Sequence, residues 1–162
     1  MTFHPSTARS AVAPISLKGR ALRLLSGREY SRAELERKLA VFEENPGDLA
    51  RALDELQAKD FINEQRVVDS VLYRRAGKLG AARIRQELQT KGLDPGAVLD
   101  AVASLQSTEL ARAREVWRKK FGSPPEDAAA RGKQQRFLLA RGFSSDAVRR
   151  VVAGSDDWED AS

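Results

Sequence analysis

Lys91-Gly92-Leu93-Asp94 and Arg141-Gly142-Phe143-Ser144 follow one order: a basic residue, a glycine, an apolar residue and a short polar residue. A stretch of this kind ends one helix and begins the next. The basic side chain suits the negative end of a helix dipole, and the glycine can adopt the left-handed conformation that terminates a helix. The Asp or Ser can then cap the following helix. Because the order recurs roughly fifty residues apart, it predicts a repeat protein.

Helical spacing of apolar residues extends through most of the remaining chain. Ser31 and Glu34 have the spacing of a capping box, and Asn63 and Asp94 stand where helix N-caps are expected. Pro46 is expected in the first turn of another helix. No segment shows the sustained two-residue alternation of a strand, so the pattern predicts an all-α fold of about nine helices.

We expect three tandem three-helix repeats between a flexible leader and an acidic tail. The predicted boundaries are 1–16 for the leader, 17–62, 63–106 and 107–154 for the repeats, and 155–162 for the tail. A unit of about 45–50 residues has little core of its own, so neighbouring repeats are expected to share apolar surface. The predicted result is an elongated, curved array.

The composition argues against disulfides and membrane spans. The chain has 162 residues, 41% of them hydrophobic, and no cysteine. No stretch approaches the roughly 18 uninterrupted apolar residues of a membrane helix, and the N-terminus lacks a continuous apolar signal segment. We therefore expect a cytoplasmic monomer with no membrane partner.

The residue types also argue against an enzyme. The one histidine, His4, lies in the predicted leader, and Gly77-Lys78-Leu79-Gly80 lacks the Lys-Ser or Lys-Thr of a phosphate-binding loop. Carboxylates such as Glu34, Glu36 and Glu87 are interleaved with basic residues and are expected to form surface ion pairs. We predict no catalytic residue, no cofactor and no metal site.

Charge is distributed unevenly along the chain. The formal net charge is +5, from 28 Lys and Arg against 23 Asp and Glu. Four of the acids lie in the tail: Asp156, Asp157, Glu159 and Asp160. Without those four, 28 basic groups face 19 acidic ones, a net charge of +9. A basic body suits a polyanionic or acidic partner, although a well-solvated helical surface is an alternative explanation.

Two groups of basic residues are candidate contact sites. The first consists of Arg74, Arg75, Lys78, Arg83, Arg85 and Lys91. The Gly77–Gly80 turn would bring its two halves together as a patch for phosphates or acidic side chains, although some members also suit a helix dipole. The second candidate is a stripe in the third repeat: Arg114, Arg118 and Arg136.

Aromatic residues near these groups allow two roles. Trp117 and Phe121 have the spacing of core residues, which we favour over base stacking, and Tyr73 is either a hinge aromatic or a partly exposed contact. A helix-turn-helix that reads DNA bases is disfavoured, because the candidate helix has few suitable side chains: Arg51, Asp54 and Gln57.

Three longer segments carry a family resemblance: SRAELERKLA (31–40), LDELQAKDFINEQRVVDSVLYRRAGKLGAARIRQELQTKGL (53–93) and RFLLARGFSSDAVRRVV (136–152). In sequence, order and spacing they resemble the RecX family, the regulators of the RecA recombinase. The family commonly ends its second helix with a glycine and an aromatic residue, where this chain reads Val41-Phe42-Glu43-Glu44-Asn45-Pro46. The first repeat is therefore expected to turn differently.

The resemblance implies three tandem three-helix repeats in a cytoplasmic modulator that binds the RecA–single-stranded-DNA filament. Members of the family typically lodge in the filament groove or block its growing end. They thereby inhibit strand exchange, ATP hydrolysis and the co-protease activity behind the SOS response. The resemblance assigns interaction residues to Arg74, Arg83, Arg85 and Lys91. Two other functions stay open: a basic helical-repeat protein that binds DNA independently of RecA, and a generic adaptor for another protein.

Overall fold

The computed structural model describes residues 14–154 and is built from helices alone in that range. The elements are α1 (Leu17–Gly27), α2 (Arg32–Leu39), the 3-10 turn η1 (Ala40–Phe42), α3 (Asp48–Ala58), α4 (Glu64–Arg75), α5 (Ala81–Thr90), α6 (Pro95–Gln106), α7 (Glu109–Lys120), α8 (Ala128–Ala140) and α9 (Ser145–Val152). The prediction of an all-α fold is confirmed.

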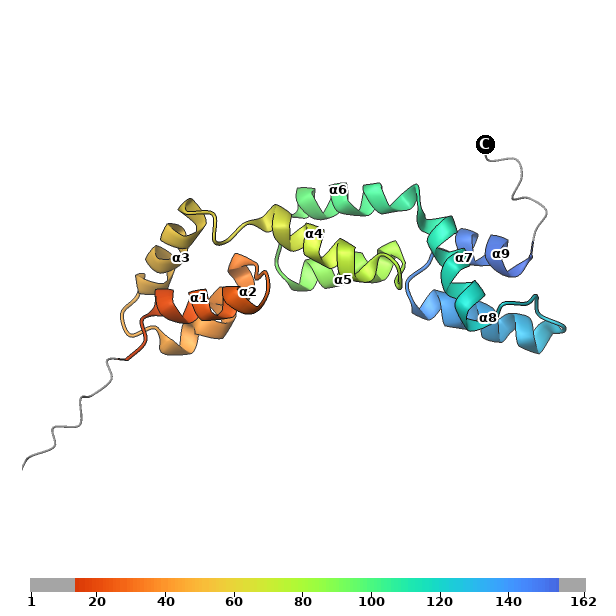
Figure 1. Ribbon diagram of the computed structural model, residues 1–162, viewed down its shortest axis with the longest axis horizontal. Coiled ribbons are helices and arrows are strands. Elements are labelled where there is room, and N and C mark those ends of the chain that lie inside the picture. Colours follow the sequence, from red (N-terminus) through yellow and green to blue (C-terminus); the bar gives the residue numbers. More distant parts are fainter. Residues whose placement is uncertain (1–13, 155–162) are drawn as a thin grey trace, which may run out of the picture.

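The helices form three units that follow one another in an elongated row (Figure 1). Helices α1–α3 lie at one end, α4–α6 in the middle and α7–α9 at the other end. The predicted acidic tail and most of the predicted leader lie outside the described residues. Ser16, at the end of the predicted leader, caps α1, because its Oγ accepts a hydrogen bond from the Gly19 amide at 3.0 Å.

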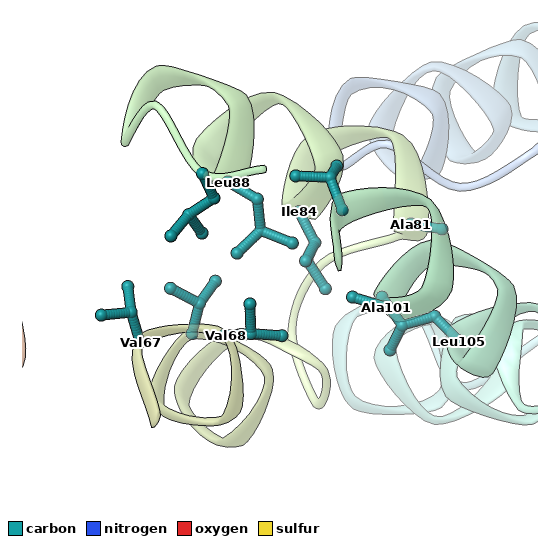
Figure 2. Close-up of a cluster of buried hydrophobic side chains, with 10 residues drawn as sticks. Val67, Val68, Ala81, Ile84, Leu88, Ala101 and Leu105 are labelled. Atoms are coloured by element: carbon teal, nitrogen blue, oxygen red, sulfur yellow. The ribbon is translucent and has the colours of Figure 1, made fainter. Parts of the chain in front are cut away.

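Each unit has its own core of buried apolar side chains. In the middle unit, α4, α5 and α6 contribute side chains such as Val67, Ile84 and Leu105 to one buried cluster, which Figure 2 shows in close-up. Separate clusters form around Leu35 in the first unit and Leu138 in the third. The three buried clusters do not merge across repeats, so the apolar surface that neighbouring repeats are expected to share does not extend to a common core.

Helix ends follow the predicted capping pattern. Ser31 and Glu34 form a complete capping box at the start of α2. The Asn63 side chain accepts a hydrogen bond from the Arg66 amide at 3.0 Å, and Asp94 caps α6 in the same way. These caps supply acceptors for N–H groups that have no partner within their own helix.

The start of α3 differs from the prediction. Pro46 precedes the helix, which begins at Asp48 after Gly47, a residue in the left-handed region with φ of 90°. The Glu43 carboxylate accepts a hydrogen bond from the Leu49 amide at 2.7 Å and so supplies the missing cap. The first unit therefore does turn differently, through η1 and a cap that comes from six residues upstream.

The separate cores lead to a stability prediction. Ile84→Ala should lower the free energy of unfolding by about 2–5 kcal/mol, because the Ile84 side chain is fully buried. Leu99→Ala, a matched change at a side chain that is 64% exposed, should stay within about 0.5 kcal/mol of the parent. Urea denaturation followed by circular dichroism measures both. Equal losses in the two variants would contradict the assigned core.

Candidate functional site

The two glycine turns of the sequence lie where consecutive repeats meet. We call the contact between the first and second repeats junction 1 and the contact between the second and third repeats junction 2. At junction 1, Ser31 Oγ donates a hydrogen bond to the Lys91 carbonyl at 2.5 Å. At junction 2, the Gly80 amide donates to the Arg141 carbonyl at 2.8 Å. Ser31 and Gly80 are the N-caps of α2 and α5, so both junctions use equivalent positions.

Junction 1 is held by an ion pair that is largely shielded from solvent. Lys91 Nζ lies 3.3 Å from the Glu34 carboxylate, and these side chains are 11% and 12% exposed. Arg28 also donates to Glu34 at 2.9 Å, and Arg37 donates to the Thr90 carbonyl at 2.8 Å. Lys91 is thus engaged within the chain, in contrast to the contact role that the sequence predicts for it.

The charge of Glu34 is favoured by this environment. Burial alone would raise the pKa of Glu34, but hydrogen bonds from Arg28 and the Ser31 amide, together with the charge of Lys91, outweigh it. The pKa of the carboxyl therefore lies below its ordinary value of 4.5. Glu34 serves as the N3 residue of the capping box and as the anion of junction 1 at the same time.

Backbone atoms come into direct contact at junction 2. Besides the Gly80 hydrogen bond, the Ala82 amide donates to the Gly142 carbonyl at 3.3 Å. A Cβ on Gly142 would lie 2.6 Å from the Arg83 backbone nitrogen, and one on Gly80 would lie 2.3 Å from the Gly142 carbonyl carbon. Gly142 also has φ of 89°. Junction 2 therefore requires glycine on both sides.

Arginine side chains complete junction 2. Arg83 donates to the Ala140 carbonyl at 2.9 Å, and Arg112 donates to the Ala76 and Leu79 carbonyls at 3.0 and 2.7 Å. Burial lowers the pKa of Arg112, and the charge of Glu109 opposes that shift. These guanidinium groups satisfy carbonyl oxygens near the ends of α4 and α8.

A first groove of about 530 Å³ lies between the first two repeats. Its lining residues are Glu34, Arg37, Arg75, Leu79, Arg83, Gln86, Glu87, Thr90 and Lys91. Arg75 Nε lies 3.2 Å from the Glu87 carboxylate, so part of the positive charge in this groove is neutralised from within the chain.

A second groove of about 380 Å³ lies beside junction 2. Its lining residues are Gly77, Lys78, Val116, Lys119, Lys120, Phe137 and Arg141, which include four cations and no acid. The Arg141 guanidinium lies 4.3 Å and Lys120 Nζ 5.5 Å from the centre of the Phe137 ring. Arg141 Nε is buried and has no hydrogen-bond partner among the described residues. This groove offers anion-binding groups around a half-buried aromatic ring.

The basic residues that the sequence places in one group are divided between the two grooves. Lys78 lines it, whereas Arg75, Arg83 and Lys91 line the first groove. Lys119, Lys120 and Arg141 were absent from the candidate set. Their one sequence signal is a shared position in the last turn of a helix or just after it, which is also where a basic residue suits the dipole. Only the packing at junction 2 distinguishes a converging set from residues at the separate ends of α7 and α8.

The other predicted contact residues lie in different surroundings. Arg74, Arg85 and Arg136 are exposed, and Arg74 donates to the Ser70 carbonyl of its own helix. Arg118 makes a two-pronged contact with Glu115, at 2.6 and 3.0 Å. Arg114 is half-buried, and burial lowers its pKa.

Trp117 and Phe121 pack within the third repeat, the role that the sequence favours for them, whereas Tyr73 is exposed. Trp117 packs against the third core and its Nε1 donates to Gln134 at 2.9 Å. Phe121 meets Phe137 edge-to-face, with ring centres 5.3 Å apart. Tyr73 is 92% exposed and is therefore available as a contact.

The described residues contain no cluster of three or more His, Cys, Asp or Glu side chains that could hold a metal ion. Over the same part of the chain, no helix combines the length and the apolar character that crossing a membrane requires.

Comparison with known proteins places the chain in a family. Residues 18–56 match the family model described as RecX, first three-helix domain, and residues 107–152 match RecX, third three-helix domain. The regulatory protein RecX of Leptothrix cholodnii is 53% identical over 90% of this chain and 93% of its own length. The chain belongs to the RecX family. RecX of Ralstonia nicotianae is 48% identical over 88% of this chain and 90% of its own length.

Solved RecX structures share the fold. A crystal structure of regulatory protein RecX superposes with a TM-score of 0.69 at 20% identity, over 86% of this chain and 72% of that one. RecX from Lactobacillus salivarius gives a TM-score of 0.66 at 22% identity, over 85% of this chain and 93% of that one. These likenesses support the helical-repeat architecture.

Junction 2 provides a mutational test. Gly142→Ala should destabilise the protein by at least about 1–2 kcal/mol, the cost of left-handed backbone alone, because the new Cβ also meets Arg83. Amide exchange at Gly80 and Ala82 should become faster, as observed by NMR. Gly77→Ala is the matched control, since a Cβ there has nothing within 4 Å. Protection of both amides at the parental level in Gly142→Ala would refute the contact.

Junction 1 predicts a pH dependence. Because the folded pKa of Glu34 is lowered, its contribution to stability is present above pH 4.5 and is lost as the pH falls through the folded pKa. Glu34→Gln should therefore be less stable than the parent at pH 7. The gap in melting temperature between the variant and the parent should narrow in acid. Glu36→Gln, at a more exposed ion pair with Arg32, should show a smaller gap. Thermal melts across pH measure this, and a gap independent of pH would contradict the assignment.

Proposed function

We propose that this protein binds the RecA–single-stranded-DNA filament and inhibits strand exchange, ATP hydrolysis and the co-protease activity of RecA. It thereby modulates recombinational repair and the SOS response. Membership of the RecX family supports a regulatory role, since the relatives are named regulatory proteins. On this proposal the protein acts in the cytoplasm, as a monomer and without catalysis.

The second groove is the observation that carries the proposal. Four cations surround it and none of its lining residues is acidic, so its field favours phosphates or acidic side chains. Its lining residues belong to the second and third repeats. These repeats are neighbours in the elongated row of Figure 1. A row of this kind can lie along a helical polymer and contact several subunits at once. The proposed mechanism is steric and electrostatic: the bound row resists rearrangement or growth of the filament.

We propose a revised set of contact residues. The exposed members of the predicted set that form no ion pair among the described residues stay in it: Arg74, Lys78, Arg83, Arg85 and Arg136. Lys119, Lys120 and Arg141 join them because they line the second groove. Arg75, Lys91 and Arg118 are expected to contribute less, since each is engaged with a carboxylate of this chain. The same holds for Arg114, because it is half-buried.

Direct DNA binding is the second candidate function, and Phe137 is the observation that favours it. Single-stranded nucleic acids bind where cations follow the backbone and an aromatic ring accepts a base. Binding of this kind would not need RecA. The association constant K would fall as salt is added. The slope of log K against log salt concentration is about 0.7 per phosphate contact for single strands.

A charge reversal tests both candidates. Lys78→Glu combined with Lys120→Glu should reduce inhibition of the RecA ATPase and weaken co-sedimentation with filaments. Arg23→Glu combined with Lys38→Glu is the matched control in the first repeat, because both side chains are exposed. Circular dichroism checks that each variant is folded. Undiminished inhibition by the second-groove variant would show that the filament binds elsewhere.

The same variants separate the two candidates. If DNA alone is the partner, the parent should bind an oligothymidine without RecA. The slope of log K against log salt concentration should then be smaller by about 1.4 for the double variant, because two phosphate contacts are lost. If the filament is the partner, binding should need RecA on the strand. Failure to bind either the filament or the oligothymidine would contradict both candidates.

A further inference from the structure

We propose that the acidic C-terminal segment, residues 155–162, docks in the second groove and competes there with the groove's polyanionic partner. The competition rests on the proposed function, whereas the docking itself does not. The segment reads Ser-Asp-Asp-Trp-Glu-Asp-Ala-Ser and contains four carboxylates, one aromatic residue and no basic residue.

The groove and the segment are complementary in charge. Lys78, Lys119, Lys120 and Arg141 face four acids: Asp156, Asp157, Glu159 and Asp160. Carboxylates among the described residues neutralise little of the groove's positive charge. Lys119 Nζ lies 3.8 Å from Glu115, whose carboxylate already binds Arg118, and no ion pair involving Lys78 or Lys120 occurs among the described residues. Arg141 likewise has no ion pair in that range, and its buried Nε lacks a hydrogen-bond partner there.

The two are also complementary in shape and polarity. Trp158 stands in the middle of the acids, two on each side, just as Phe137 and Val116 lie among the cations of the groove. An indole ring can pack against that apolar floor or lie against the Arg141 guanidinium. The acids on either side of Trp158 would then face the surrounding ammonium groups.

The segment begins within reach of the groove. A Cβ on Gly154 would lie 3.5 Å from Pro124, so the described chain ends beside that residue. Pro124 and Lys120 are four residues apart in the sequence, so their Cα atoms are at most about 14 Å apart. Eight further residues span up to about 26 Å when extended. The acids can therefore reach Lys120 and the groove beyond it.

Tethering lets a weak contact be occupied. A short flexible tether gives an effective concentration in the range of about 1 mM, so a contact with a dissociation constant near that value is about half occupied. A polymeric partner with many contacts would displace the segment, whereas a single weak anion would not. The docked segment thus acts as a filter that favours extended polyanions over isolated acidic groups.

Fluorescence of Trp158 tests docking without RecA. The chain has two tryptophans, Trp117 and Trp158, so the difference between the full chain and Trp158→Phe isolates the tail signal. We expect Trp158 in the parent to be shielded from acrylamide relative to the free peptide of residues 154–162. Shielding should fall to the peptide level in 0.5–1 M salt, because screening weakens exposed ion pairs.

Charge reversal locates the docking site. Lys119→Glu combined with Lys120→Glu should expose Trp158 as fully as the free peptide, with the same variant carrying Trp158→Phe as its own baseline. Arg23→Glu combined with Lys38→Glu changes the net charge equally and should leave Trp158 shielded. Two results would overturn the inference: a parental Trp158 as accessible as the peptide, or equal exposure in both charge-reversed variants.

Neutralising the segment tests the competition. Asp156→Asn, Asp157→Asn, Glu159→Gln and Asp160→Asn together should tighten binding to RecA–single-stranded-DNA filaments. Unchanged affinity in a protein whose parent does bind filaments would overturn the competition. Absence of filament binding by the parent would instead overturn the proposed function, and the fluorescence result would still decide the docking.

Discussion

The contact between a helix N-cap and the glycine turn of the next repeat determines how this molecule is assembled. Gly80 meets Arg141 and Gly142, and Ser31 meets Lys91, at equivalent positions. Because the three cores do not merge, these junctions fix how the repeats lie relative to one another. Both grooves are formed beside them, so the geometry of any partner surface depends on contacts that leave no room for a Cβ on Gly80 or Gly142.

The polar contacts at the junctions also divide the basic residues into two groups, those bonded within the chain and those that face a groove. Lys91, Arg83 and Arg112 satisfy carboxylate or carbonyl oxygens at the junctions, whereas Lys78 and Lys120 face a groove without acids. The turn after α2 is built without the glycine of the other two turns. It runs through η1, and Glu43 supplies the cap of the next helix.

Local features were predictable from the sequence and contacts between repeats were not. Caps at Ser31, Asn63 and Asp94, the all-α class and the family resemblance follow from short-range patterns that the structure and the comparisons confirm. The second groove depends on which helix ends meet across junction 2, and no spacing along the chain reveals that pairing. The sequence also left Lys91 available to a partner, because its ion pair with Glu34 joins residues 57 positions apart.

The chain lacks cysteine, so one introduced thiol can be labelled without background. The most direct measurement is photo-cross-linking from Lys78→Cys in the second groove to RecA–single-stranded-DNA filaments, compared with Leu99→Cys on the exposed side of α6. We expect cross-links to the filament from position 78 and few from position 99. Cross-links from position 99 with none from position 78 would contradict binding through the second groove.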